Sequence, residues 1–120
     1  MSTQSEEEVQ QKFQELQVIE HNLQNLLMQK QSSSMELGET SNALDEVRKS
    51  KETIYKMVGS IMVVVDKDLI VKELEEKKKV LELRSDSIFK QEKVMEVKAR
   101  DLQSDIKKIL ETKSSSEKKK

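Results

Sequence analysis

The scarcity of turn-forming residues restricts the fold of this sequence more than any other feature. Its 120 residues include no proline and only two glycines, Gly38 and Gly59. Compact folds need many turns and build them mainly from Gly, Pro and small polar residues, so this chain can reverse direction only once or twice. Charged residues make up 38% of the chain and aromatic residues 2%. Long helices packed along a narrow seam fit this composition better than a thick core.

Apolar residues recur every seven positions in two long segments, residues 8–49 and 67–112, and such rows are typical of coiled-coil helices. One row is Val9, Leu16, Leu23, Lys30, Leu37 and Leu44, which is apolar except for Lys30. The other is Leu74, Leu81, Ile88, Met95, Leu102 and Ile109, which has no polar member. At 1.5 Å per residue the two helices would be about 63 and 67 Å long. Nearly equal lengths on either side of one reversal predict an antiparallel helical hairpin. In the predicted register, the numbers of facing residues sum to 118.

Residues 54–65 change period and predict a β-hairpin between the two helices. The apolar runs 54–58 and 61–65 flank Gly59-Ser60, and glycine tolerates the positive φ of a two-residue type II′ turn. Both faces of this hairpin are apolar and its edges carry unpaired backbone groups, whereas an isolated hairpin is marginally stable. We therefore predict that it joins hairpins of other chains in an oligomeric β-barrel. The predicted assembly residues are Ile54, Tyr55, Met57, Val58, Gly59, Ile61, Met62, Val63, Val64 and Val65.

An alternative is that the hairpin folds back onto its own helices, although these could cover only one of its faces. The fold class is thus mainly α, a long antiparallel coiled-coil hairpin with a central β-hairpin, in a single domain of residues 8–112. Residues 1–7 are predicted to be a flexible N-terminus, and the Lys/Ser-rich residues 113–120 a disordered tail. Residues 32–34 and Gly38 are weak helix formers, so the first helix is expected to continue there with a bend or local softness.

Catalysis requires a pocket with converging polar groups, which a two-helix arm lacks, so we predict no enzymatic activity and no catalytic residue. The chain has no cysteine and one histidine, His21, and Asp66 and Asp68 fit helix caps better than a cation site. We therefore predict no metal and no cofactor. The 22 basic and 23 acidic residues are balanced, which argues against nucleic acid. The longest apolar run, residues 61–65, is too short to cross a membrane, and a cytoplasmic location is expected.

Four segments together resemble one known family. IYKMVGSIMVVVDKD (54–68) is similar to the central hairpin of β-type prefoldin subunits. ELEEKKKVLELR (73–84) and KQEKVM (90–95) resemble the start of that family's second helix, and LGETSNALDEV (37–47) the end of its first. The single central hairpin fits the β type, because α-type subunits carry two. The sequence departs from the family at Ser32–Ser34 and Gly38, where stronger helix formers are usual.

The resemblance implies a chaperone subunit that works without ATP. Its partners would be α-type prefoldin subunits and further β-type copies in a hetero-hexamer, built on a double β-barrel with six coiled-coil arms. Such assemblies bind unfolded client proteins near the tips of the arms and pass them to a cytosolic group II chaperonin. Apolar residues near both chain ends, where a coiled coil frays, are the candidate client-binding residues. They are Val9, Phe13, Leu16, Leu102, Ile106, Ile109 and Leu110.

Two other functions compete with this interpretation. In a structural or tethering coiled-coil protein, the helices would pair with other helices and residues 54–65 would form an unusual loop. An RNA-binding helical hairpin is the other, and the balanced charge argues against it. A discrete hexamer with α-type subunits would indicate the chaperone, and a parallel dimer the tether.

Overall fold

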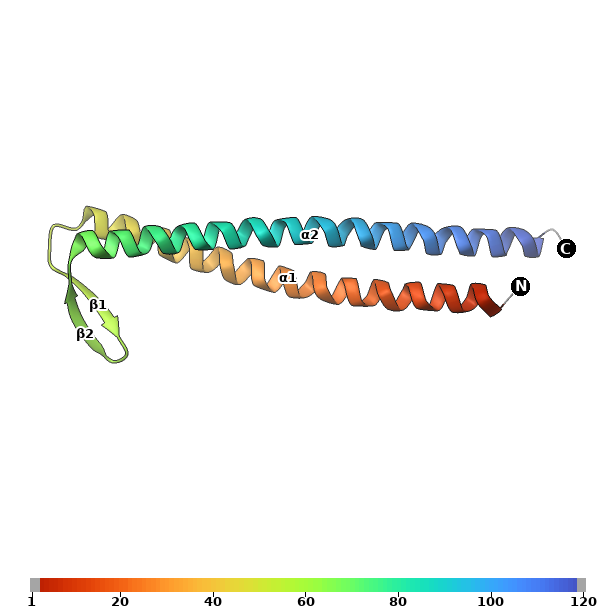
Figure 1. Ribbon diagram of the computed structural model, residues 1–120, viewed down its shortest axis with the longest axis horizontal. Helices are drawn as coiled ribbons and strands as arrows, with labels where there is room; N and C mark the ends of the chain where they lie inside the picture. Colours follow the sequence, from red (N-terminus) through yellow and green to blue (C-terminus); the bar gives the residue numbers. More distant parts are fainter. Residues whose placement is uncertain (1–2, 119–120) are drawn as a thin grey trace. The chain divides into compact units, whose positions relative to one another are not determined.

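The computed structural model describes the backbone of residues 3–118 and the side chains of residues 4–112. The chain forms helix α1 (Thr3–Lys49), strands β1 (Ile54–Val58) and β2 (Ile61–Val65), and helix α2 (Lys67–Lys118), in that order (Figure 1). The predicted helical hairpin with a central β-hairpin is therefore confirmed. α1 is continuous through Ser32–Ser34 and Gly38. Neither helix is long and apolar enough, over the described residues, to cross a membrane.

The chain divides into two compact units, each built from parts of both helices. The first, which we call the terminal unit, combines residues 3–28 of α1 with residues 89–118 of α2. The second, the hairpin unit, is Gln29–Ile88 and contains both strands. Each unit has its own stretch of seam.

In the terminal unit, the side chains withdrawn from solvent recur at alternating spacings of four and three residues, which is the pattern of a coiled-coil seam. On α1 they include Ser5, Val9, Lys12, Leu16, Ile19, Leu23 and Leu26, and on α2 Met95, Ala99, Leu102, Ile106 and Ile109. Lys12 occupies a seam position, and its Nζ lies 3.6 Å from Asp105 Oδ2 on the other helix. Its aliphatic stem can therefore pack while its charge stays at the rim.

The seam of the hairpin unit includes a polar layer. Leu44 and Leu81 are its most buried side chains, whereas Ser33 and Thr40 are the buried polar ones. The Ser33 and Ser85 hydroxyls lie 3.3 Å apart across the seam, and Thr40 donates to the Glu36 carbonyl at 2.8 Å. The numbers of Ser33 and Ser85 sum to 118, so this hydrogen bond confirms the predicted register within the unit.

The β-hairpin has the predicted strands and turn. β1 and β2 are antiparallel, with Ile54 opposite Val65 and Val58 opposite Ile61. Gly59 has φ +64°, while Ser60 has no positive φ. That combination fits a type II′ turn and excludes type I′, which needs positive φ at both central residues. At the start of α2, Asp66 caps the helix by accepting a hydrogen bond from the Asp68 N–H at 3.4 Å.

Both helices extend beyond their predicted bounds of 8–49 and 67–112. Residues 3–7, predicted to be flexible, are helical. The spacing of the seam residues continues to Ser5, and the negative charge of Glu6 in the first turn interacts favourably with the positive end of the helix dipole. Residues 113–118, predicted to be disordered, are also helical. Serine costs only a few tenths of a kcal/mol relative to alanine in a helix, and lysine near a C-terminus is favourable. Residues 1–2 and 119–120 lie outside the described part.

Gly59→Val should disrupt the hairpin, at a cost of about 1–3 kcal/mol for a β-branched residue at positive φ. A Cβ at Gly59 would meet no atom within 4 Å, so the cost comes from backbone strain and not from a clash. Amide hydrogen exchange should show lost protection of the β1 and β2 amides while helical circular dichroism is retained. Ser60→Val is the control and should be tolerated. Full protection in Gly59→Val would show that the turn does not depend on glycine.

The Ser33–Ser85 layer should limit the stability of the seam. Replacing both serines by leucine exchanges a polar pair for apolar packing, which should raise the free energy of unfolding by roughly 1–2 kcal/mol. Thermal unfolding followed by circular dichroism measures the change. Ser32→Leu, at an exposed position of the same turn, should leave the melting temperature nearly unchanged. An unchanged or lower melting temperature in the double variant would mean that the seam is too narrow there for leucine.

Candidate interaction surfaces

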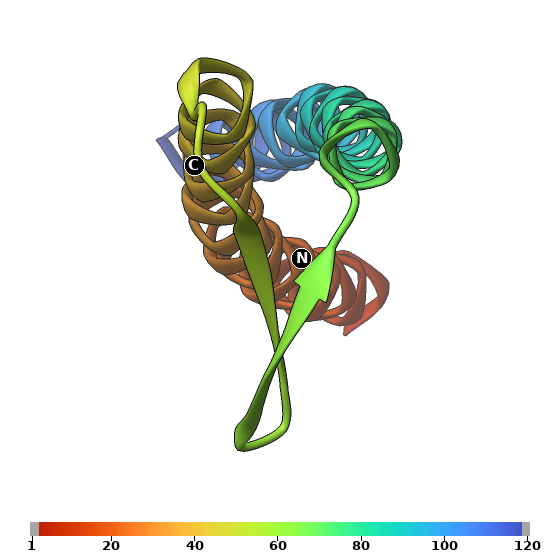
Figure 2. The same ribbon diagram turned by 90° about the vertical axis from the view of Figure 1, so that its left-hand side faces the viewer.

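The β-hairpin is the first candidate surface, because its apolar side chains remain largely uncovered. One face carries Tyr55, Met57, Met62 and Val64, all exposed. On the other face, Ile54 and Val65 at the base are half-buried, while Val58 and Ile61 near the turn are exposed. The described residues hold two strands, so each strand has one edge without a neighbour. Figure 2 shows the hairpin extending away from the helix ends of its unit, with its strands twisted about each other.

One lysine fixes the base of the hairpin to a helix, and a second lysine and an arginine join the two helix ends beside it. Lys56 Nζ on β1 lies 2.8 Å from Glu73 Oε1 on α2. Lys67 Nζ donates to the carbonyls of Arg48 and Ser50, at 3.0 and 2.9 Å, and so satisfies acceptors at the end of α1. Arg48 pairs with Glu75. The contact of Lys56 with Glu73 positions the base of the apolar hairpin against α2. The alternative, in which the helices cover one face, is realised only at this base.

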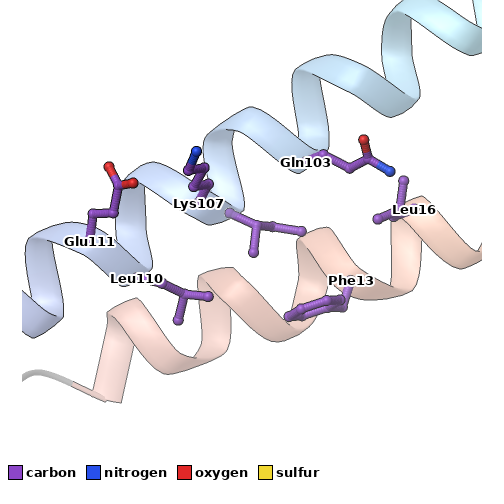
Figure 3. A pocket seen from close by; sticks show the side chains of 7 residues that line it. Phe13, Leu16, Gln103, Lys107, Leu110 and Glu111 are labelled. Carbon is purple, nitrogen blue, oxygen red and sulfur yellow. The ribbon is translucent and has the colours of Figure 1, made fainter.

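An apolar groove in the terminal unit is the second candidate surface. It encloses about 380 Å³ and is lined by Phe13, Leu16, Gln103, Ile106, Lys107, Leu110 and Glu111. Leu16 and Ile106 form its floor and are 8% and 5% exposed, whereas Phe13 and Leu110 are each 46% exposed. Figure 3 shows Leu110 pointing from α2 toward α1 with Phe13 beside it, while Lys107 and Glu111 point away. We call this feature the tip groove.

The seven predicted client-binding residues thus fall into two groups. Four of them, Phe13, Leu16, Ile106 and Leu110, line the tip groove. The other three, Val9, Leu102 and Ile109, are half-buried in the seam and do not line it. Sequence analysis missed the polar rim, Gln103, Lys107 and Glu111. Gln103 lies three residues from Ile106, and Lys107 lies three residues from Leu110. This spacing was an available signal for these two, because residues that far apart are neighbours on a helix surface.

Among the described residues, no group of three or more His, Asp or Glu side chains is placed to hold a metal ion. His21 is exposed on α1, and Asp66 serves as a helix cap. What the arrangement offers is uncovered apolar surface of two kinds, a strand pair with free edges and a groove between helices.

These features define a class of protein: a two-helix coiled coil whose reversal is a β-hairpin exposed for assembly. The chain matches the family model described as Prefoldin subunit over residues 7–113. It is 35% identical over 105 residues to prefoldin subunit beta of Sulfurisphaera tokodaii, covering 86% of this chain and 84% of that protein. It is 38% identical over 105 residues to prefoldin subunit beta of Saccharolobus islandicus, covering 86% and 83%. The crystal structure of the prefoldin beta subunit from Thermococcus strain KS-1 superposes with a TM-score of 0.78, at 35% identity, over 84% of this chain and 90% of that one.

The chain therefore belongs to the prefoldin subunit family, and it resembles the beta subunits of that family over most of its length. The resemblance found in the sequence is confirmed. Prefoldin subunits are non-enzymatic chaperone subunits that assemble into hetero-oligomers with α subunits.

Charge placed on either face of the hairpin should block assembly. Val64 is 67% exposed and Val63 39% exposed, so Val64→Asp in particular should leave the isolated chain folded. In an assembled sheet each buried carboxylate would cost several kcal/mol or take up a proton. Native mass measurement with an α-type prefoldin subunit should show no complex for either variant. Val80→Asp, an equal change at an exposed position of α2, should assemble. Normal assembly of Val64→Asp would mean that its face stays in solvent.

Proposed function

We propose that this chain is the β-type subunit of a cytoplasmic hetero-hexameric chaperone that works without ATP. The complex binds unfolded polypeptides at the ends of its coiled coils and passes them to a group II chaperonin. The observation that carries the proposal is the tip groove, in which Phe13 and Leu110 are half exposed above a buried apolar floor.

The hairpin supports the assembly part of the proposal. Strand edges attract further strands, and several hairpins can close into a barrel that removes edges and buries both faces. The partners are α-type subunits and further copies of this chain. A tethering coiled coil would have no use for ten residues of antiparallel strand, of which seven are exposed. The ion pair of Lys56 with Glu73 ties the base of the hairpin to α2, while the side chains near the turn stay exposed.

The shape and chemistry of the groove support the client part. A groove of this size accepts a large apolar side chain, and apolar contacts discriminate little between sequences. Lys107 and Glu111 at its rim carry opposite charges, which keep the surface hydrated without favouring clients of one charge. Each such contact is weak, and several arms acting on one client would multiply the affinity through effective concentration.

Nucleotide is not needed for this mechanism. The sequence carries two glycines, and neither belongs to a phosphate-binding loop. Release of a client would follow from competition by the chaperonin for the same apolar residues, since weak separate contacts can be exchanged one at a time.

Phe13→Ser combined with Leu110→Ser tests the groove without disturbing the seam, because neither side chain is buried. The assembled complex should keep its mass and lose most of its ability to suppress aggregation of a denatured test protein. The activity of the unmodified complex should vary little between low and high salt, since apolar contacts are not screened.

Val18→Ser combined with Val94→Ser is the control, because both valines are exposed in the terminal unit and lie outside the groove. This variant should hold clients normally. Full holding activity in the Phe13/Leu110 variant would move the client site to the outer faces of the helices or to the β-hairpin.

A further inference from the structure

The two sides of the seam differ in the terminal unit. In an antiparallel coiled coil, the residues called e flank the seam on one side of both helices, and the residues called g flank it on the other. The seam spacing assigns e to Phe13, Glu20, Leu27, Phe89, Glu96, Gln103 and Leu110. It assigns g to Glu8, Glu15, Asn22, Gln91, Lys98, Asp105 and Thr112. The e side holds both phenylalanines of the chain, and every g residue is polar or charged.

The hairpin unit shows the usual arrangement for comparison. Arg48 and Glu75, at e positions, form an ion pair across the helices. Glu36 and Lys77, at g positions, form another, with Nζ 3.7 Å from Oε1. Flanking positions in coiled coils commonly carry such charge pairs. The apolar e side is therefore confined to the terminal unit, the unit that contains the tip groove.

Leu27 and Phe89 form a second apolar patch on this e side, and we call it the second patch. They are 47% and 54% exposed. Their numbers sum to 116, as do those of Phe13 and Gln103, which line the tip groove together. Leu27 and Phe89 therefore flank the seam as a facing pair, at positions equivalent to those of Phe13 and Gln103. Lys93 Nζ lies 5.2 Å from the centre of the Phe89 ring, so one face of the ring has a cationic neighbour.

The second patch lies at a distance from the groove that one extended peptide can span. Phe13 and Leu27 are 14 residues apart on α1, which is about 21 Å along a helix. An extended chain rises roughly 3.3 Å per residue, so six or seven residues cover that distance. Glu20 lies midway between them on the same side, and Glu96 lies between Phe89 and Gln103 on α2. Glu96 is paired with Lys93, whose Nζ lies 3.8 Å from Glu96 Oε2. A segment crossing from groove to patch therefore passes the Glu20 carboxylate and this ion pair.

We propose that one extended client segment occupies the tip groove and the second patch together. This inference rests on the proposed function and names the segment it prefers: two large apolar residues six or seven positions apart, with a basic or neutral residue between them. The charge that such a segment meets between the two apolar sites is the Glu20 carboxylate, because Lys93 offsets the charge of Glu96. An unfolded polypeptide that carries a basic residue has the opposite, complementary charge.

Labelled unstructured peptides test the inference on the full-length chain assembled with an α-type prefoldin subunit. One peptide carries a single Phe, a second carries two Phe seven positions apart with Lys between them, and a third carries two Phe three positions apart. Fluorescence anisotropy should show that the seven-spaced peptide binds ~10-fold or more tightly than the other two, because its second contact is intramolecular. Equal affinity for all three peptides would overturn the inference.

Double variants test which residues cause the tighter binding of the seven-spaced peptide, which we call the gain. Leu27→Ser with Phe89→Ser should remove the gain and leave binding of the single-Phe peptide unchanged. Val94→Ser with Val97→Ser is the matched control, since both valines are exposed at similar levels and lie off the e side; it should keep the gain. Loss of the gain in this control would mean that general hydrophobicity binds the peptide, and would overturn the inference.

Two further outcomes separate this inference from the proposed function. If Phe13→Ser with Leu110→Ser abolishes single-Phe binding but Leu27→Ser with Phe89→Ser keeps the gain, the tip groove stands and the second patch is wrong. If the Phe13/Leu110 variant binds every peptide normally, the proposed client site itself fails. An altered oligomer mass in the Leu27/Phe89 variant would identify the patch as a contact between subunits and would also overturn the inference.

Discussion

A seam between two helices buries only one stripe of each helix, and the rest of this structure depends on that constraint. The buried apolar side chains of the described residues are few: Leu16, Leu26, Leu44, Ile70, Leu81, Ile88 and Ile106. All lie on or beside the seam, and the part of the chain that the structure describes has no third helix to cover another face. Every apolar residue off the stripe stays in water unless another molecule covers it. The β-hairpin and the tip groove are the places where such residues gather.

The architecture was predictable because it depends on repeating patterns. Two rows of period seven, one glycine turn and a switch to β-branched residues at 54–65 locate both helices and both strands. The helix ends were less predictable, because they depend on small differences in propensity and on the helix dipole. The sequence also did not distinguish the residues that form the floor of the tip groove from those that form its walls. Phe13 and Ile106 both lie three or four residues from the main rows, yet Ile106 is buried and Phe13 is half exposed.

Lys12 explains that difference. In the alternating spacing of the α1 seam, the position between Val9 and Leu16 belongs to Lys12, not to its more hydrophobic neighbour Phe13. Counting apolar residues leaves Phe13 open to either role, seam packing or client contact, because it lies three or four residues from the main row. Lys12 can nevertheless occupy the seam, because its stem is apolar and its ammonium reaches Asp105. A polar residue inside the seam thereby leaves an aromatic residue outside it.

The two exposed surfaces differ in the kind of binding that each permits. Strand edges offer directional backbone hydrogen bonds in a fixed register, which suits permanent and specific subunit contacts. The tip groove and the second patch offer side-chain burial without backbone hydrogen bonds, which suits brief contacts with many sequences. The division follows from secondary structure: helices satisfy their own backbone groups and leave side chains to bind, whereas an edge strand leaves its backbone to bind. The proposed function uses both kinds of binding, firm assembly through the hairpin and loose holding of clients through the helices.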